Sequence, residues 1–251
     1  MTEAEKMRFD RIVYNVLRGD REKGQSIGTY NEKRMHIILK RFLEEDETCY
    51  EAKVGPYVAD ILRGKEIIEV QTGSFYPMKE KITYYLGETD FNVTVVRPLP
   101  YIKWRVWIDK DSGEISKRTK SRIKTEPKHV MRDWLFLGDF LGNKRLTIRF
   151  LLLEEEEFRF LDGWSADKKR GSSRYERLPL ALIGDDSYNL PSDYARLLPD
   201  SLGDTFTASE YGKALSLRSS YAFYAGVKIL CLAGLVRKDG KRGRSALYVR
   251  I

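Results

Sequence analysis

The chain has 251 residues, of which 42% are hydrophobic and 33% are charged. This length allows one or two domains with a core that needs no disulfide or metal, and the hydrophobic share excludes a chain that is disordered throughout. No apolar run reaches the roughly 18 residues of a membrane helix, and the charged N-terminus lacks the apolar core of a signal peptide. Only Cys49 and Cys231 are cysteines, which excludes a disulfide scaffold. We therefore expect a reduced, cytoplasmic protein with no membrane partner.

The net charge of +8 is distributed unevenly along the chain. Residues 1–100 carry 16 basic and 17 acidic side chains, and residues 151–200 carry 7 and 11. Residues 101–150 carry 13 basic against 6 acidic side chains, and residues 201–251 carry 9 against 3. Basic segments of this kind are typical of phosphate binding, although charge alone is equally consistent with a role in solubility.

The first hundred residues predict the element order α-β-β-β-α-β. Asn31 can cap a first helix that runs to Leu43, because apolar residues follow the i, i+3, i+4, i+7 spacing of a helix face. The turn signals Gly55-Pro56 and Gly64-Lys65 separate three short strands. Arg97-Pro98 is expected to end the last strand. The expected ranges are 32–43 for the first helix, 49–54, 57–62 and 66–71 for the strands, 77–86 for the second helix and 91–96 for the last strand.

The middle of the chain predicts fewer regular elements. Strands over 103–108 and 114–118 are expected to form a hairpin around Asp111-Ser112-Gly113. A helix over 129–141 and a strand over 146–153 follow. The Gly-, Ser- and Lys-rich stretch 162–176 is expected to be a loop.

The last fifty residues have the outline of a winged helix, a relative of the helix-turn-helix. Thr207 and Glu210 form a capping box at the start of a helix that ends near Leu215. A second helix is expected over 220–232. Strands over 235–238 and 246–250 then flank a basic tip at 239–244.

Three carboxylates are expected to form one row across the first three strands. A two-residue loop at Gly64-Lys65 places Asp60 opposite Glu69, and one at Gly55-Pro56 places Glu51 opposite Asp60. A wider loop at Pro56 would shift Glu51 by one residue, because proline fits poorly in a primed turn.

A bound metal ion would explain why three carboxylates lie in one row. Neighbouring carboxylates repel one another unless a cation lies among them, and Mg²⁺ takes hard oxygen ligands. Gln71 shares the same face because strand side chains alternate with period two. We expect Glu51, Asp60 and Glu69 to hold Mg²⁺ or Mn²⁺; the alternative is a solvated polar face of the sheet.

At this point the sequence resembles the PD-(D/E)XK nuclease superfamily. Asp60, eight intervening residues and then Glu69-Val70-Gln71, within the order α-β-β-β-α-β, carry the resemblance over roughly residues 28–97. Ala59 stands where the family has proline, and Gln71 stands where it has the catalytic lysine. The Glu-Val-Gln ending, followed by Lys79 and Lys81, is similar to the competence-protein CoiA type, in which glutamine replaces that lysine.

The resemblance implies a restriction-endonuclease-like fold and Mg²⁺-dependent hydrolysis of phosphodiester bonds. Asp60 and Glu69 would hold the metal, helped by the Val70 carbonyl. The positive charge at the reacting phosphate would come from Lys81, or from Lys79 if the helix is rotated. Three further residues, Glu32, His36 and Lys40, share one face of the first helix; Glu32 would hold a second metal or a water, and His36 either packs near the site or carries protons.

Two groups of residues are candidates for DNA contact. In the C-terminal module they lie at the start of the second helix and in the basic tip: Arg218, Ser220, Tyr221, Lys238, Lys241, Arg242 and Arg244. In the middle of the chain they are Lys117, Arg118, Lys120 and Arg122, which alternatively belong to a solvated hairpin.

The sequence as a whole predicts an α/β (α+β) protein with four segments. These are a polar segment 1–27, a nuclease-like core 28–100, an extension 101–200 and a winged-helix-like module 201–251. The expected function is that of a metal-dependent DNA endonuclease in DNA processing, repair or defence, and a homodimer is compatible with the sequence. The alternatives are a non-catalytic DNA-binding regulator and a protein-interaction module, since winged helices also contact proteins.

Overall fold

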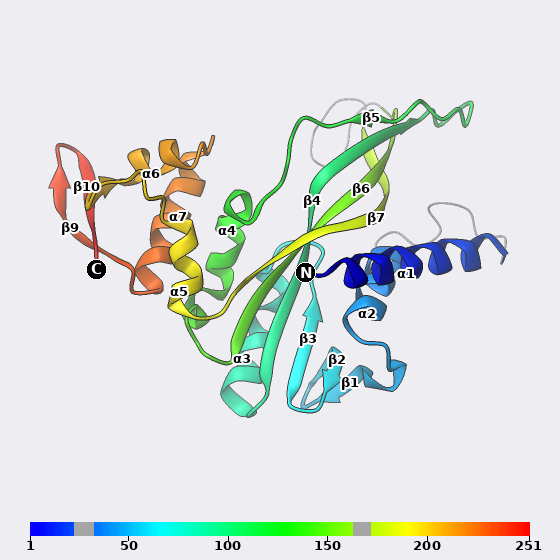
Figure 1. Ribbon diagram of the computed structural model, residues 1–251, viewed down its shortest axis with the longest axis horizontal. Helices are drawn as coiled ribbons and strands as arrows, with labels where there is room; N and C mark the ends of the chain where they lie inside the picture. Colours follow the sequence, from blue (N-terminus) through cyan, green and yellow to red (C-terminus); the bar gives the residue numbers. More distant parts are fainter. Residues whose placement is uncertain (23–32, 163–171) are drawn as a thin grey trace. The chain divides into compact units, whose positions relative to one another are not determined.

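The computed structural model describes residues 1–22, 33–162 and 172–251 and is a mixed α/β protein (Figure 1). Its larger sheet has the strand order β1-β2-β3-β4-β6-β7, with β5 beside β4, and its smaller sheet has the order β8-β10-β9. None of the described helices is long and apolar enough to cross a membrane. The strands are β1 Tyr50–Val54, β2 Tyr57–Arg63, β3 Glu66–Val70, β4 Asn92–Ile108, β5 Thr119–Lys120, β6 Leu146–Phe160, β7 Ser173–Tyr188, β8 Thr205–Thr207, β9 Val236–Arg242 and β10 Ser245–Arg250. The α-helices are α1 Glu3–Glu22, α2 Lys33–Leu43, α3 Lys79–Glu88, α4 Met131–Trp134, α5 Pro191–Tyr194, α6 Ala208–Ala214 and α7 Ser220–Leu232.

The chain divides into two compact units, and each unit draws on segments that are distant in the sequence. The first unit comprises residues 1–50, 98–125 and 151–185, and the second comprises 51–97, 126–150 and 186–251. The expected segments 28–100 and 101–200 each contribute to both units. Residues 201–251 share the second unit with β2, β3 and α3.

The expected order α-β-β-β-α-β is confirmed from α2 to β4. Turns at 55–56 and 64–65 connect the three short strands, and both turn glycines adopt the positive φ that such tight turns need. β2 and β3 are antiparallel, with Ile61 opposite Ile68, whereas β3 and β4 are parallel. Parallel neighbours require a crossover connection, and α3 provides it.

The α3 helix packs its apolar side chains into the core of the second unit. Ile82 and Tyr85 are fully buried, as is Ile67 on β3. Tyr84 covers the turn at Gly55 so closely that a Cβ atom there would lie 2.0 Å from the tyrosine hydroxyl oxygen and 2.4 Å from the nearest ring carbon. This packing fixes the face of α3 that lies toward β2 and β3.

The expected end of the fourth strand at Arg97-Pro98 is wrong, because β4 continues to Ile108. β3 ends opposite Val96, so the prolines beyond this point stand where β4 no longer pairs with β3. A missing N–H costs little where a strand has lost a neighbour. The antiparallel return after β4 is confirmed, but its strand is only Thr119–Lys120, with an isolated bridge between Ile108 and Ile115.

Two further expectations in the middle of the chain differ from the structure. The helix expected over 129–141 is broken into a 3₁₀ turn at Pro127–Val130, the short α4, and a 3₁₀ segment at Leu135–Phe140 that contains Gly138. Glycine is a poor helix former, which favours this break. The expected loop 162–176 is partly wrong because β7 begins at Ser173, and residues 163–171 lie outside the described residues.

The C-terminal elements follow the expected pattern more closely. Thr207 and Glu210 form the expected capping box, with the Thr207 amide donating to Glu210 Oε2 at 2.7 Å. α7 spans Ser220–Leu232 as expected. The turn between β9 and β10 is shorter than the expected tip, because β9 extends to Arg242.

Candidate functional site

The centre of the candidate site is Glu69, a carboxylate buried near the end of β3. The residue is only 2% exposed to solvent. The antiparallel register brings Asp60, on β2, to the same end of the hairpin, one step beyond the pair Ile61 and Ile68. Asp60 is half-buried and its Oδ2 atom accepts a hydrogen bond of 2.7 Å from the Val70 amide. Asp60 is thereby anchored to the strand that carries Glu69.

Two side chains from α3 complete the surroundings of Glu69. The Lys81 ammonium lies 2.7 Å from Glu69 Oε2, and the Tyr85 hydroxyl donates to Glu69 Oε1 at 3.2 Å. Residues four apart lie side by side on a helix, so α3 presents both groups to one carboxylate. Lys79 points elsewhere and lies 3.4 Å from Asp139 Oδ2. Of the two lysines that the sequence offered, Lys81 is therefore the one beside Glu69.

Burial and charge act in opposite directions on Glu69. Burial is the largest influence and raises the pKa of Glu69, and the Asp60 carboxylate raises it further. The Lys81 ammonium lowers the pKa but does not cancel these effects, so the pKa of Glu69 rises to about 7. Burial and the neighbouring carboxylates also raise the pKa of Tyr85, which keeps its hydroxyl protonated as a hydrogen-bond donor.

Tyr85 is the residue of this site that the sequence interpretation missed. The signal was present, because Tyr85 follows Lys81 by four residues within an expected helix. Gln71, by contrast, was expected at the centre. Its side-chain amide instead donates to the Ser74 carbonyl, so it closes the turn that leads from β3 toward α3.

The remaining expected site residues lie in different surroundings. Glu51 is exposed and has a φ of 52°, a left-handed backbone conformation that is uncommon for a residue other than glycine. The described residues contain no group of three acidic, His or Cys side chains able to share one metal ion, so the expected row of three carboxylates does not form a three-ligand site. His36 and Lys40 belong to α2 in the first unit, where the Lys40 ammonium lies 4.8 Å from the Tyr50 ring centroid. Glu32 lies outside the described residues.

The donor set fits a hard divalent cation with two carboxylates. Mg²⁺ commonly takes one or two protein carboxylates and completes its shell with water and phosphate oxygens. Each oxygen of Glu69 accepts one hydrogen bond from α3 and keeps a second lone pair. A cation would also relieve the repulsion between Asp60 and Glu69 that raises the pKa of Glu69.

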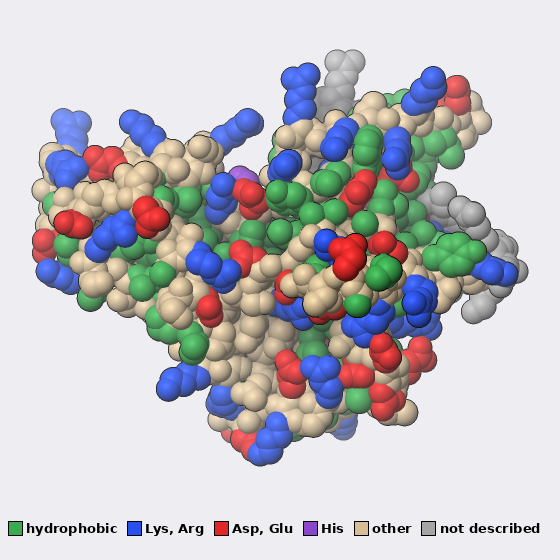
Figure 2. Space-filling view, viewed as in Figure 1, with side chains coloured by type: hydrophobic (Ala, Val, Ile, Leu, Met, Phe, Trp, Pro, Cys, Tyr) green, Lys and Arg blue, Asp and Glu red, His purple; other side chains and the backbone are tan. Residues whose placement is uncertain are grey.

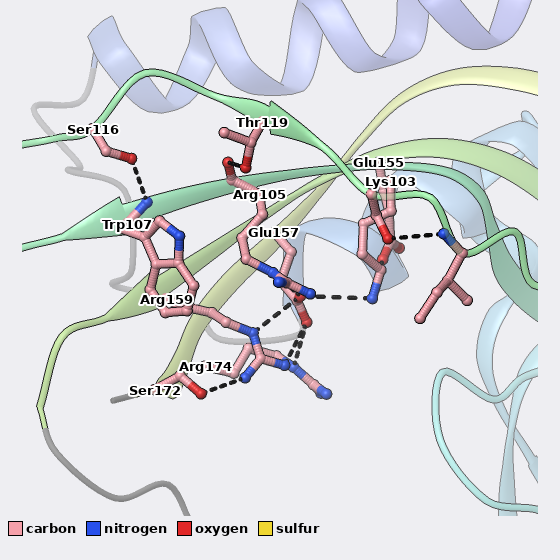
Figure 3. A network of polar contacts seen from close by, with 12 residues as sticks. Lys103, Arg105, Trp107, Ser116, Thr119, Glu155, Glu157, Arg159, Ser172 and Arg174 are labelled. Atoms are coloured by element: carbon pink, nitrogen blue, oxygen red, sulfur yellow. Dashed lines mark hydrogen bonds and ion pairs between the residues drawn. The ribbon is translucent and has the colours of Figure 1, made fainter. Parts of the chain in front are cut away.

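A second buried polar cluster lies on β4, β6 and β7 in the first unit (Figure 3). Glu157 is fully buried, and cationic side chains surround its carboxylate: Lys103, Arg105, Arg159 and Arg174 lie 3.0 to 3.9 Å from it. Burial raises the pKa of Glu157, but the Arg159 hydrogen bond and the cationic charges outweigh it and lower the pKa to about 2. Because this carboxylate is already neutralised by cations, the cluster is suited to holding the three strands together rather than to binding a metal.

The candidate DNA-binding residues of the C-terminal module are on the surface. Tyr221 is 70% exposed, and Figure 2 shows Lys and Arg side chains projecting over the β9–β10 hairpin. The exposed members of the expected set are Arg218, Ser220, Tyr221, Lys238, Lys241, Arg242 and Arg244. Arg242 is already paired, because it donates to Glu210 Oε1 at 2.9 Å and to Thr205 Oγ1 at 3.1 Å.

In the middle of the chain, the side chains of Lys117, Arg118, Lys120 and Arg122 are also exposed. Arg118 lies 3.9 Å from Glu156, and its guanidinium lies 4.2 Å from the Trp104 ring centroid.

Comparison with known proteins identifies one family. A family model described as a domain of unknown function, DUF8091, matches residues 33–188, more than half of the chain. The match includes Asp60, Glu69 and Lys81 and ends with β7, so β8 to β10 lie beyond it. No curated protein and no solved structure matches the chain. The chain belongs to the DUF8091 family.

Proposed function

We propose that the protein is a metal-dependent nuclease that hydrolyses phosphodiester bonds in DNA. The observation that carries the proposal is the convergence of two carboxylates and one ammonium group at the end of β3. Lys81 lies 2.7 Å from Glu69, whose pKa is raised partly by the charge of Asp60. Carboxylates with perturbed pKa values are concentrated at functional sites, and Mg²⁺ sites commonly combine one or two carboxylates with phosphate oxygens.

The fold around these residues supports the same proposal. The order α2-β1-β2-β3-α3-β4, with β2 and β3 antiparallel and β3 and β4 parallel, resembles the core of the PD-(D/E)XK nucleases. In that family a lysine follows the second acidic residue by two positions, where this chain has Gln71. Lys81 brings an ammonium group to Glu69 from α3 instead, which supports the lysine-relocated variant of the family.

The roles of the side chains follow from these contacts. Asp60 and Glu69 would hold Mg²⁺ or Mn²⁺, which supplies an activated water and neutralises phosphate charge when bound. The Val70 amide fixes Asp60, and Tyr85 fixes one oxygen of Glu69. Lys81 favours the ionised form of Glu69 and would supply positive charge to the reacting phosphate.

The C-terminal elements support DNA as the substrate. The order β8-α6-α7-β9-β10, with β10 between β8 and β9, resembles a winged helix. Tyr221 and Tyr224 on α7 are 70% and 61% exposed, and the adjacent β-hairpin is basic. We propose that this module contacts the DNA backbone.

A cleavage assay tests the proposal. Purified protein would be incubated with linear duplex, single-stranded and branched DNA in the presence of Mg²⁺ or Mn²⁺. We expect cleavage that is lost on addition of a chelator and in the Asp60→Asn variant. The matched control is Asp90→Asn, because Asp90 is an exposed aspartate that pairs with Lys65 away from Glu69.

Two results would redirect the proposal. DNA binding without cleavage of any substrate would favour the non-catalytic regulator instead. Equal cleavage by the wild type and the Asp60→Asn variant would contradict the assigned site.

A further inference from the structure

The polypeptide between residues 116 and 125 forms a basic arm that runs back along β4 in the first unit. Backbone hydrogen bonds attach it to β4 at several points: the Ser116 amide donates to the Trp107 carbonyl at 2.9 Å, Ser121 donates to Lys103 at 2.8 Å, and Thr125 donates to Pro100 at 3.1 Å. Between these points Lys120, on β5, is the antiparallel strand partner of Trp104, on β4. The arm is therefore held in place along its length rather than hanging free.

The basic arm carries five cationic side chains and, up to Thr125, no acidic one: Lys117, Arg118, Lys120, Arg122 and Lys124. All five are exposed. Figure 2 shows Lys and Arg side chains interspersed with hydrophobic ones over β5 and the end of β4. A surface of this composition is suited to a ligand that carries several negative charges and also has apolar faces.

Aromatic side chains of β4 lie directly beneath these cations. The Lys124 ammonium lies 4.9 Å from the Tyr101 ring centroid, and the Lys120 ammonium lies 5.4 Å from that of Trp104. Such cation–π contacts restrain long side chains that would otherwise be mobile. The cations are thus positioned before any ligand arrives.

A pocket of about 440 Å³ opens between the arm and β4. Its lining residues are Tyr101, Ile102, Lys120, Ser121, Arg122 and Lys124. The pocket therefore combines an aromatic ring and an aliphatic side chain with three cations and a hydroxyl group.

We propose that this pocket binds single-stranded nucleic acid, with one nucleotide inserted and its phosphates on Lys120, Arg122 and Lys124. A duplex keeps its bases stacked inside and offers only its backbone, whereas a single strand exposes base faces for stacking on aromatic rings. The size of the pocket suits one nucleotide and not the width of a duplex. The proposal rests on the proposed function in one respect only, the assignment of nucleic acid as substrate, and it narrows that substrate to one with a single-stranded segment.

Fluorescence anisotropy with labelled oligonucleotides tests the proposal. The Asp60→Asn background prevents cleavage during the measurement, and the probes are a single-stranded DNA, an RNA of the same sequence and the matching DNA duplex. We expect either single strand to lose affinity by about tenfold in Tyr101→Leu, because base stacking is lost. For the double variant Lys120→Gln/Lys124→Gln we expect a salt dependence that is flatter by about 1.4 in log–log slope.

The duplex should be affected far less than the single strands, since the C-terminal module is expected to hold it. The matched control is Arg11→Gln/Lys65→Gln, which removes the same charge from exposed positions outside the arm.

Three results would overturn the inference: equal losses for single strand and duplex, no loss in either arm variant, or equal competition by polyglutamate, which offers charge without bases. Binding of Mn²⁺ by the wild-type chain is measured in parallel. Intact single-strand binding without metal binding would contradict only the proposed nuclease function, whereas metal-dependent cleavage without single-strand binding would contradict only this inference.

Discussion

Two buried glutamates differ in what surrounds them, and this difference separates the candidate site from the structural ion cluster. Glu157 lies among several cations and its pKa falls to about 2, whereas Glu69 lies between one ammonium group and a second carboxylate and its pKa rises to about 7. The charge of Glu157 is therefore already balanced within the protein. Glu69 has unbalanced negative charge beside it and can accept either a proton or a metal ion. The two glutamates are alike in burial and differ in the balance of the charges around them, and this difference supports the proposal made for Glu69.

The first prediction concerns the ion cluster and has the largest expected effect. Replacing Glu157 by glutamine leaves Lys103, Arg159 and Arg174 without their common anion. Removing one partner from a buried ion pair costs about 3–5 kcal/mol, so Glu157→Gln should lower the free energy of unfolding by about that much. Urea unfolding at pH 7 measures it. Glu156→Gln is the control, and equal losses in both variants would contradict the structural role.

The second prediction concerns the pH dependence of stability and tests the opposite environment of Glu69. The folded protein binds a proton at Glu69 more tightly than the unfolded chain does, so this group stabilises the fold at low pH, and that stability is lost as pH rises through about 7. Relative to Glu69→Gln, the wild type should lose about 3 kcal/mol between pH 4.5 and 7.

Urea unfolding of the two proteins across this range measures the loss, and parallel stability curves would show that Glu69 is not perturbed. Glu157→Gln supplies the contrast. A carboxylate with a lowered pKa contributes stability that is present above its unfolded pKa and is lost only as pH falls toward 2. The difference in unfolding free energy between the wild type and Glu157→Gln should therefore stay constant between pH 4.5 and 7.

The third prediction separates the two lysines of α3. Lys81 contacts Glu69, whereas Lys79 contacts Asp139. Lys81→Ala should reduce DNA cleavage by about a hundredfold while changing DNA affinity little, because the lysine acts on the reacting phosphate. Lys79→Ala is the matched control and should cleave normally. Normal cleavage by Lys81→Ala, with the rate determined under single-turnover conditions, would refute the role of this lysine.

The fourth prediction concerns Tyr85 and has the smallest effect. Tyr85→Phe removes the 3.2 Å hydrogen bond to Glu69 Oε1 and should cost about 1 kcal/mol of stability. Loss of this donor also destabilises the ionised carboxylate, so the pKa of Glu69 should rise further. The exposed Tyr76→Phe serves as the control. Thermal unfolding that does not distinguish the two variants would show that the Tyr85 hydroxyl is not a significant partner of Glu69.

Local patterns predicted much of the fold, and the reason is visible in particular elements. The turn at Gly64 predicted the register of β2 and β3, and the capping box of Thr207 and Glu210 predicted the start of α6. Each of these signals depends on neighbours within a few residues. The length of β4 was not predicted, because its continuation through Pro98 and Pro100 depends on which strands lie beside it.

Local patterns also predicted part of the candidate site. The period-two alternation placed Asp60 and Glu69 at the same end of the hairpin, and the spacing along α3 offered Lys81. The positive φ of Glu51 is a backbone feature with no sequence signature in a glutamate, and among the described residues no third carboxylate completes a metal-ligand group with Asp60 and Glu69. The choice between Lys79 and Lys81 required the rotation of α3, which the buried contacts of Ile82 and Tyr85 determine.

The most direct test of the central claim is calorimetric titration of the protein with Mn²⁺ at pH 8, where Glu69 is ionised. Asp60 and Glu69 are proposed to hold the ion, so the wild type should bind it and Asp60→Asn should fold normally but show no measurable binding. Asp90→Asn should bind like the wild type. Unchanged Mn²⁺ affinity in Asp60→Asn would contradict the assignment of this pair of carboxylates as a metal site.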